Sequence, residues 1–211
     1  MGGEPIVHRV CNFIAALILL VLSAPVQLVT AIVLFRQLGA PVMFRQARAG
    51  QGGRVIVVPK FRTMTDARDA RGALLPDAQR ETRVTRLIRR LRLDELPQLL
   101  AVVRGRMALV GPRPLLPATV AGFGRLGELR NSVPPGLTGW AQISGNTHLD
   151  DQEKLALDLW YVAHRSLALD LRILAETALV PLRGEIRSEP RLRRAQDWLG
   201  GWQRGPGAEV A

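Results

Sequence analysis

The sequence predicts an α+β protein, mainly α, that is monotopic: a re-entrant helix-break-helix at the N-terminus anchors it in one side of a membrane. Three features support this fold class: a long uncharged apolar segment, several amphipathic helices suited to a membrane interface, and one small β element among Gly/Pro-rich loops. We expect a membrane helix over 1–39, one globular domain over 40–184 and a C-terminal tail over 185–211.

Composition restricts the class of partner. The 211 residues carry a formal net charge of +11, and nearly all cations are arginines, since the only lysines are Lys60 and Lys154. Guanidinium groups bind phosphate in a bidentate manner, so nucleic acid, anionic lipid headgroups and nucleotide substrates all remain open. The single cysteine, Cys11, excludes an intrachain disulfide, and the three scattered histidines lack the spacing of a metal site.

The first element is apolar. Residues 10–35 contain no charge and exceed the roughly 20 residues that span a bilayer. Pro25 lacks an N–H and its ring collides with the carbonyl of Val21, so we expect a break at Ser23 to Pro25, where the Ser23 hydroxyl satisfies a backbone carbonyl. The two halves, about 14 and 10 residues, are each too short to cross the hydrocarbon core.

Charges on both sides of this segment bear on its topology. Arg9 precedes it and Arg36 and Arg45 follow it, whereas a simple span should show an asymmetry of positive charge. A re-entrant dip, which returns both ends to the same side, fits this pattern. From the residues alone, a kinked single span is an equally good interpretation.

The next two elements are a strand and a basic helix. Residues 54–58, "RVIVV", follow a glycine-rich turn and predict a strand or hairpin arm, which "PKFRTM" then leaves as a loop carrying Lys60. Val84, Leu87, Ile88 and Leu91 form a helical stripe with arginines around it. Such a helix suits an anionic membrane surface, and packing on an ordinary core is nearly as good an explanation.

Two adjacent carboxylates follow in "LRLDELPQLL". Pro97 suits the first turn of a new helix, which places Asp94 and Glu95 at or just before its N-terminus. The peptide dipoles and the upstream arginines should favour the ionised carboxylates. An ionised Asp94 could act as a nucleophile toward phosphorus or as a metal ligand, while a simple helix cap is the alternative.

Stiff loops and two further helices complete the domain. "LVGPRPLLP" is too rich in proline to be helical and should present Arg113 on an extended turn, and "PPGLTGWAQISGN" is a second stiff loop that Trp140 can anchor. The first of two helices after it is capped by Asp150 or Asp151 and the second by Ser166.

The remaining residues, 185–211, follow Gly184. This tail is polar and should fray, except for an interfacial piece around Trp198 and Trp202.

In order and spacing, several stretches resemble the small monotopic phosphoglycosyl transferases of bacteria. They are "FRQARAGQGG", "KFRTM", "LDELPQLL", "LVGPRPLL", "PGLTGWAQISGN" and "LDLWYVAHRSLALDLRIL", and the resemblance extends over about 9–184. It implies a re-entrant helix whose break matches Ser23 and Pro25, and a catalytic domain on the cytoplasmic face of the bacterial inner membrane, among anionic lipids.

The resemblance also implies a reaction. A sugar-1-phosphate, N-acetylated in some members, would pass from a UDP-sugar to polyprenyl (undecaprenyl) phosphate by a ping-pong mechanism that releases UMP and begins glycoconjugate synthesis at the membrane. Asp94 matches the nucleophile that becomes an aspartyl phosphosugar, and Glu95 matches its partner. Lys60, Arg89 and Arg113 match the cations of the phosphate site. Mg²⁺, held by Asp94 and Glu95, would neutralise charge.

Two other classes of protein are alternatives to a transferase. A membrane-tethered nucleic-acid-binding or scaffold protein would use the arginines on phosphates. Against it, the basic residues alternate with rigid Gly/Pro loops instead of forming a recognition helix, and only 5% of residues are aromatic and available for stacking. A metal-dependent phosphatase or nuclease would gather several acids, whereas Asp94 and Glu95 stand among arginines. We therefore expect a transferase that does not bind nucleic acid.

Overall fold

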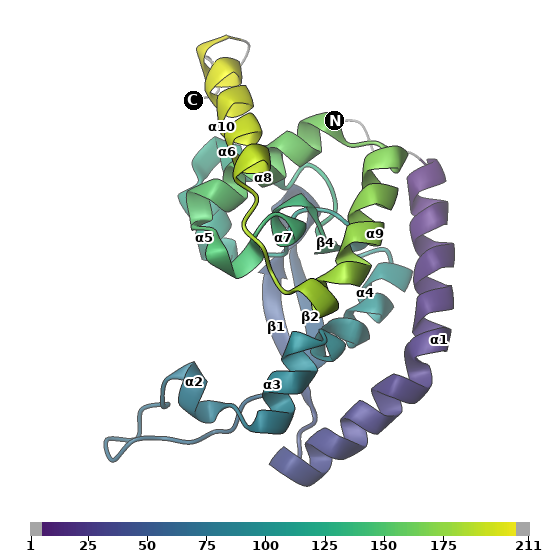
Figure 1. Ribbon diagram of the computed structural model, residues 1–211, viewed down its shortest axis with the longest axis vertical. Coiled ribbons are helices and arrows are strands. Elements are labelled where there is room, and N and C mark those ends of the chain that lie inside the picture. Colours follow the sequence, from purple (N-terminus) through teal and green to yellow (C-terminus); the bar gives the residue numbers. More distant parts are fainter. Residues whose placement is uncertain (1–5, 206–211) are drawn as a thin grey trace.

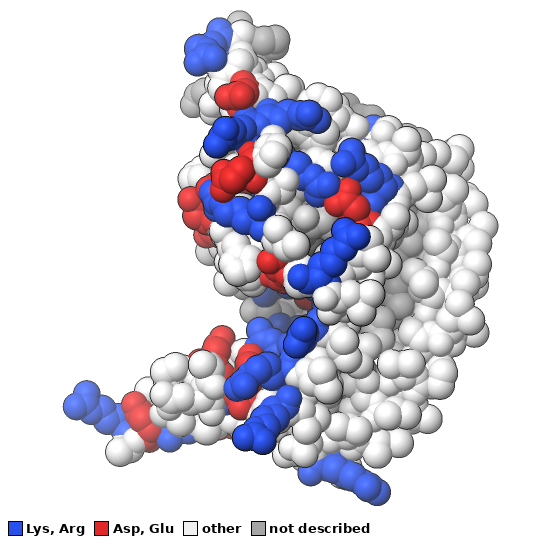
Figure 2. Space-filling view, in the orientation of Figure 1, with Lys and Arg blue, Asp and Glu red and all other residues white. Residues whose placement is uncertain are grey.

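Helix α1, Ile6–Leu38, is the longest element of the computed structural model, which describes residues 6–205. By length and composition alone, it is apolar enough to cross a membrane, with a mean hydropathy of 2.5. It runs along one side of the molecule (Figure 1), and most of that side is uncharged in Figure 2, apart from basic side chains such as Arg36 in the last turn of the helix. Most of its large apolar side chains are exposed, so the sequence's apolar segment does not form the core.

Helix α1 is one continuous helix, where two helices separated by a break were expected. Pro25 lies inside it, and the helix curves toward the lower end of the molecule in Figure 1. The Ser23 hydroxyl donates to the carbonyl of Leu19 at 2.6 Å and accepts from the Gln27 amide at 2.9 Å. Such a bond to the carbonyl four residues back bends a helix without ending it. The Ser23 hydroxyl thus bonds to the carbonyl of Leu19 and not to that of Val21. The Val21 carbonyl lacks its usual helical partner because Pro25 has no N–H.

A hairpin follows α1. Strands β1, Met43–Ala49, and β2, Val55–Phe61, pair in antiparallel register around the turn that contains the 3-10 helix η1, Gln51–Gly53. This confirms the predicted strand, but β2 continues through Pro59, so Lys60 belongs to a strand and not to a loop. Proline is tolerated there because both strands are edges and need hydrogen bonds on one side only.

An arm and a basic helix come next. The short helix α2, Asp77–Arg80, lies in the arm that projects from the body in Figure 1. Helix α3, Arg83–Arg90, begins at Thr82, whose side chain forms a capping box with Thr85. Ile88 is buried and Leu87 is exposed on α3, which confirms an amphipathic helix.

The two adjacent carboxylates lie in a 3-10 helix, η2, Leu93–Gln98, which leads into α4, Leu99–Val103. Pro97 is inside η2, so the expectation that it opens an α-helix was wrong. The reason lies at Arg92, whose left-handed backbone, with φ 56°, separates α3 from η2 and starts a tighter turn.

The proline-rich loops meet through a second, parallel sheet. Strand β3, Ala108–Val110, pairs with β4, Gly136–Thr138, and between them lie α5, Pro117–Gly122, and α6, Gly124–Arg130. A Cβ atom on Gly136 would lie 2.1 Å from the nitrogen of Gly111, so only glycine permits this approach of the two loops.

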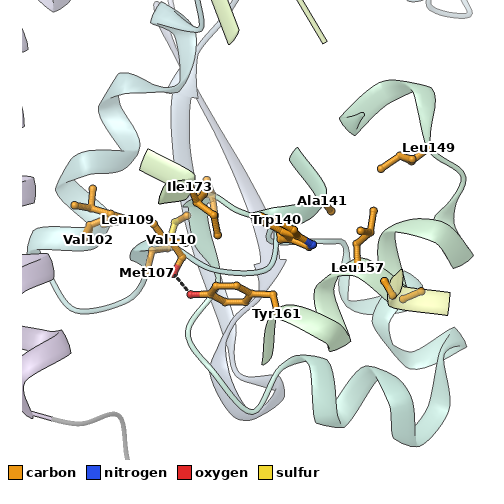
Figure 3. Close-up of a cluster of buried hydrophobic side chains, with 14 of the residues drawn as sticks. Val102, Met107, Leu109, Val110, Trp140, Ala141, Leu149, Leu157, Tyr161 and Ile173 are labelled. Carbon is orange, nitrogen blue, oxygen red and sulfur yellow. Dashed lines mark hydrogen bonds between the residues drawn. The ribbon is translucent and has the colours of Figure 1, made fainter. Parts of the chain in front are cut away.

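The core lies between β3 and the helices that follow β4. These are α7, Trp140–Ile143, the 3-10 turn η3, Asn146–His148, α8, Asp151–His164, and α9, Leu167–Arg183. The expected caps are confirmed, because Asp150 and Ser166 accept backbone hydrogen bonds at the starts of α8 and α9. In Figure 3 the ring of Tyr161 lies in this core and its hydroxyl donates to the carbonyl of Val110 at 3.3 Å.

The polar tail is more ordered than expected. Helix α10, Glu189–Arg204, packs against α8 and buries Leu192 and Ala195. The Trp198 and Trp202 rings stack on each other, with centroids 6.3 Å apart. Fraying was the wrong expectation for this segment, because its apolar side chains are spaced for one face of a helix.

Candidate active site

A cavity of about 890 Å³ opens between the hairpin, α3, η2 and the loop before α5. The structure brings all five predicted site residues of the globular domain to its wall. They come from β2, α3, η2 and the loop after β3, and are Lys60, Arg89, Asp94, Glu95 and Arg113. The membrane-helix residues Ser23 and Pro25 lie elsewhere, in α1.

Asp94 is the less tightly held of the two carboxylates. Its side chain is buried, with 9% of the residue exposed, and it forms no ion pair among the residues described. Burial and then the charge of Glu95 raise the pKa of Asp94 to about 6, although Arg89 and Lys60 oppose this. Arg89 and the backbone do favour the ionised form, as expected, but at Asp94 desolvation outweighs these contributions. The group is still largely ionised at neutral pH.

Glu95 is held as an anion. Its carboxylate accepts from Arg113 at 2.7 Å and from Arg92 at 3.4 Å. Burial alone would raise the pKa of Glu95, but Arg113 and Arg92 outweigh burial and keep the pKa below its usual range. The two adjacent carboxylates thus differ in environment: Glu95 is held by two guanidinium groups, and Asp94 is not.

A buried ion pair between Arg130 and Asp158, which the sequence did not predict, holds the backbone of Arg113 in position. The guanidinium of Arg130 donates to the backbone carbonyl of Arg113 at 2.6 Å and pairs with Asp158 at 2.7 Å. The side chains of Arg130 and Asp158 are only 1% and 2% exposed. Because α6 and α8 are distant in sequence, no local pattern could have indicated this pair.

The ion pair between Arg92 and Glu185 is a second interaction at the site that the sequence did not predict. The guanidinium of Arg92 bridges Glu95 and Glu185, to which it donates at 2.5 Å. Glu185 also accepts from the side chains of Asn146 and Thr147 and from the Thr147 backbone. Glu185 had been assigned to the tail, but it lines the cavity. Its only signal in sequence is its place directly after the helix-ending Gly184.

Lys60 and Arg89 differ in their ion pairing. Lys60 lies over the ring of Phe44, 5.4 Å from its centroid, and forms no ion pair among the described side chains. Burial lowers the pKa of Lys60, and the charge of Asp94 opposes this. Arg89 is paired with Glu81 through one nitrogen of its guanidinium.

The site contains carboxylate oxygens, which are suitable ligands for Mg²⁺. Within residues 6–205, however, no cluster of three or more His, Cys, Asp or Glu side chains is placed to hold a metal. Mg²⁺ is commonly bound by one or two carboxylates together with substrate phosphates. Asp94 and Glu95 fit this pattern, because a cation would relieve the mutual repulsion that raises the pKa of Asp94.

Comparison with known proteins defines the class. Residues 3–184 match the family model described as bacterial sugar transferase. The chain therefore belongs to the bacterial sugar transferase family.

Individual relatives are consistent with this assignment. The chain is 46% identical to the uncharacterized sugar transferase EpsL of Bacillus subtilis, over 82% of this chain and 85% of the relative. It is 42% identical to the undecaprenyl-phosphate glucose phosphotransferase of Komagataeibacter xylinus, over 79% of this chain and 34% of the relative.

A third relative is named for a different sugar. The chain is 37% identical to the UDP-N-acetylgalactosamine-undecaprenyl-phosphate N-acetylgalactosaminephosphotransferase of Aeromonas hydrophila, over 84% of this chain and 44% of the relative. The chain thus spans less than half the length of each of these last two relatives.

Proposed function

We propose that the protein transfers a sugar-1-phosphate from a UDP-sugar to undecaprenyl phosphate and releases UMP, as the first membrane step in the synthesis of a glycoconjugate. The names of the relatives support the general reaction. The observation that carries the proposal is the pair of adjacent carboxylates, Asp94 and Glu95, in different environments within one cavity that also contains three phosphate-binding candidates, Lys60, Arg89 and Arg113.

In the first step, an ionised oxygen of Asp94 attacks the β-phosphorus of the donor. A bond forms between this oxygen and phosphorus, and the bond from phosphorus to the bridging oxygen breaks. UMP leaves with that oxygen and the electron pair, while the sugar phosphate stays on Asp94. Burial favours this reaction because a poorly solvated carboxylate is a stronger nucleophile.

In the second step, a phosphate oxygen of the polyprenyl acceptor attacks the same phosphorus. The bond to Asp94 breaks, and its electron pair returns to the carboxylate. Glu95 assists the acceptor phosphate or the metal, and its arginine partners hold it in a fixed position for either role. Both steps bring anions together, so Lys60, Arg89 and Arg113 lower the barrier by neutralising charge.

A Mg²⁺ ion held by Asp94 and Glu95 would supply additional positive charge at the phosphate oxygens. We further propose that α1 enters and leaves the same leaflet of the bacterial inner membrane, with the cavity on the cytoplasmic face near anionic lipids. The curvature of α1, its exposed apolar side chains and the positive residues at both of its ends support this placement.

The reaction is tested with a panel of UDP-sugars, including N-acetylated ones, offered with undecaprenyl phosphate and Mg²⁺ while UMP is measured. The Asp94→Asn variant should release no UMP with any donor that the unmodified enzyme uses, and mass spectrometry of that enzyme without acceptor should show the sugar-phosphate adduct. Turnover by Asp94→Asn would refute the nucleophile assignment, whereas absence of UMP from every donor would refute the proposed reaction.

The topology is tested with single cysteines in a Cys11→Ser background. A cysteine at position 3 and a reference cysteine at exposed Arg54 should both be inaccessible to an impermeant reagent added outside intact cells. If position 3 reacts from outside while position 54 does not, α1 spans the membrane and the re-entrant proposal fails.

A further inference from the structure

Two half-buried cations at the cavity lack an acidic partner. Most cations around the site are paired with carboxylates, as Arg113 and Arg92 are with Glu95. In contrast, Arg48 and Lys60 form no ion pair with any carboxylate of residues 6–205. Among residues 6–205, the only hydrogen-bond partner of the Arg48 guanidinium is the side-chain oxygen of Gln46, at 2.6 Å. A partly desolvated charge of this kind is costly unless an anion binds to it.

Strand geometry places these cations on one face of the hairpin. Side chains alternate between faces along a strand, so Phe44, Gln46 and Arg48 share a face of β1. In the antiparallel register Phe44 lies opposite Lys60, which puts Lys60 on this face as well. Arg45, also on β1, points to the other face and is exposed.

This hairpin face borders the reaction site. Arg48 and Lys60 line the large cavity together with Asp94. With Glu95 and Arg113, they also line an adjoining small cavity of about 40 Å³.

The lining of the two cavities and the register of the hairpin separate these cations from Asp94. Asp94 lines the large cavity and is not among the residues that line the small one, whereas Lys60 and Arg48 line both. Arg48 lies four residues along β1 from Phe44, the partner of Lys60, which is about 13 Å of strand. Phosphoryl transfer places the attacking and leaving oxygens on opposite sides of phosphorus, so a cation on the side of the small cavity is suited to the leaving group.

We propose that Arg48, oriented by Gln46, binds the α-phosphate of the donor and stabilises the negative charge that develops on UMP as the bond from the β-phosphorus to the bridging oxygen breaks. This inference rests on the proposed function. It assigns to Arg48 a role at the leaving group, separate from that of Lys60 at the attacked phosphate.

The experiment compares Arg48→Gln with a matched control on the same strand, Arg45→Gln, in the full chain in detergent micelles. Calorimetry measures the binding of UMP and of uridine, which lacks the phosphate. Arg48→Gln should weaken UMP binding about tenfold or more, as expected for loss of a charged hydrogen bond, and leave uridine binding unchanged. Arg45→Gln should bind both like the unmodified protein, and Arg48→Lys should recover part of the UMP affinity.

Single-turnover release of UMP without acceptor gives a second readout, which should slow in Arg48→Gln and not in Arg45→Gln. The inference is overturned if Arg48→Gln binds UMP as well as the unmodified protein, or if UMP and uridine weaken equally. Failure of the proposed function looks different: the unmodified protein would then neither bind UMP nor release it from any UDP-sugar.

Discussion

The guanidinium of Arg113 donates a hydrogen bond to the carboxylate of Glu95 at 2.7 Å, across 18 positions of sequence. Glu95 lies in the 3-10 helix η2, and Arg113 lies in the loop after β3. Their contact joins the acidic pair to the proline-rich loop and makes the position of each dependent on the other.

Replacing Arg113 with glutamine should reduce stability in a pH-dependent manner. Arg113 helps to keep the pKa of Glu95 below its usual value of 4.5. The stability that this ion pair contributes is therefore fully present above that pH and is lost as pH falls through the lower, folded-state pKa. Since 40% of the Arg113 side chain is exposed, we expect a loss of only about 1–2 kcal/mol at pH 7.5. Urea unfolding in micelles at pH 7.5 and pH 3 measures it; an equal loss at both values would contradict the argument.

Replacing Asp94 with asparagine should stabilise the protein while abolishing activity. The pKa of Asp94 is about 6 in the folded state, against the usual value of 3.8 for an aspartate, so its ionised form opposes folding. This penalty is absent below pH 3.8 and complete above pH 6. We expect Asp94→Asn to gain about 2–3 kcal/mol at pH 7.5 and nothing near pH 3.5, measured by unfolding in chelator. A variant less stable than the unmodified protein at pH 7.5 would refute this environment for Asp94.

Arg92→Gly separates the backbone role of this residue from its side-chain role. Glycine adopts φ 56° without strain, so the turn before η2 should persist, and relief of this strain should offset part of the stability lost with the two ion pairs of Arg92. The link between Glu95 and Glu185 is lost, however, and UMP release should fall about tenfold or more. Thermal unfolding and single-turnover assays test both parts. Full activity would show that the bridge does not position Glu95.

The buried pair Arg130 and Asp158 can be replaced by apolar residues. The double variant Arg130→Met/Asp158→Leu should fold with nearly unchanged stability, whereas Arg130→Met alone should lose about 3–5 kcal/mol, because it leaves a buried charge unpaired. The double variant also loses the bond to the Arg113 carbonyl, so the Michaelis constant for the donor should rise. Normal donor kinetics in a folded double variant would reduce this pair to a purely structural role.

Local patterns predicted those parts of the molecule that local interactions create. The apolar segment, the hairpin strand, the amphipathic α3 and the caps Asp150 and Ser166 each depend on residues close in sequence, and each appears in the structure. Errors arose where one local rule competed with another. Pro25 bends α1 but does not divide it, and Pro59 does not end β2.

The sequence by itself determined that two carboxylates would lie among arginines next to a membrane-seeking helix, because composition and spacing are properties of the chain. The tertiary structure alone decided that Asp94 would be desolvated and that Glu95 would be held between Arg113 and Arg92. It also decided that Arg130 would bond to the backbone of Arg113 and that Glu185 would pair with Arg92. The physical reason is that burial and charge pairing depend on which distant segments meet, and close packing of β3, β4, α6 and α8 sets those meetings.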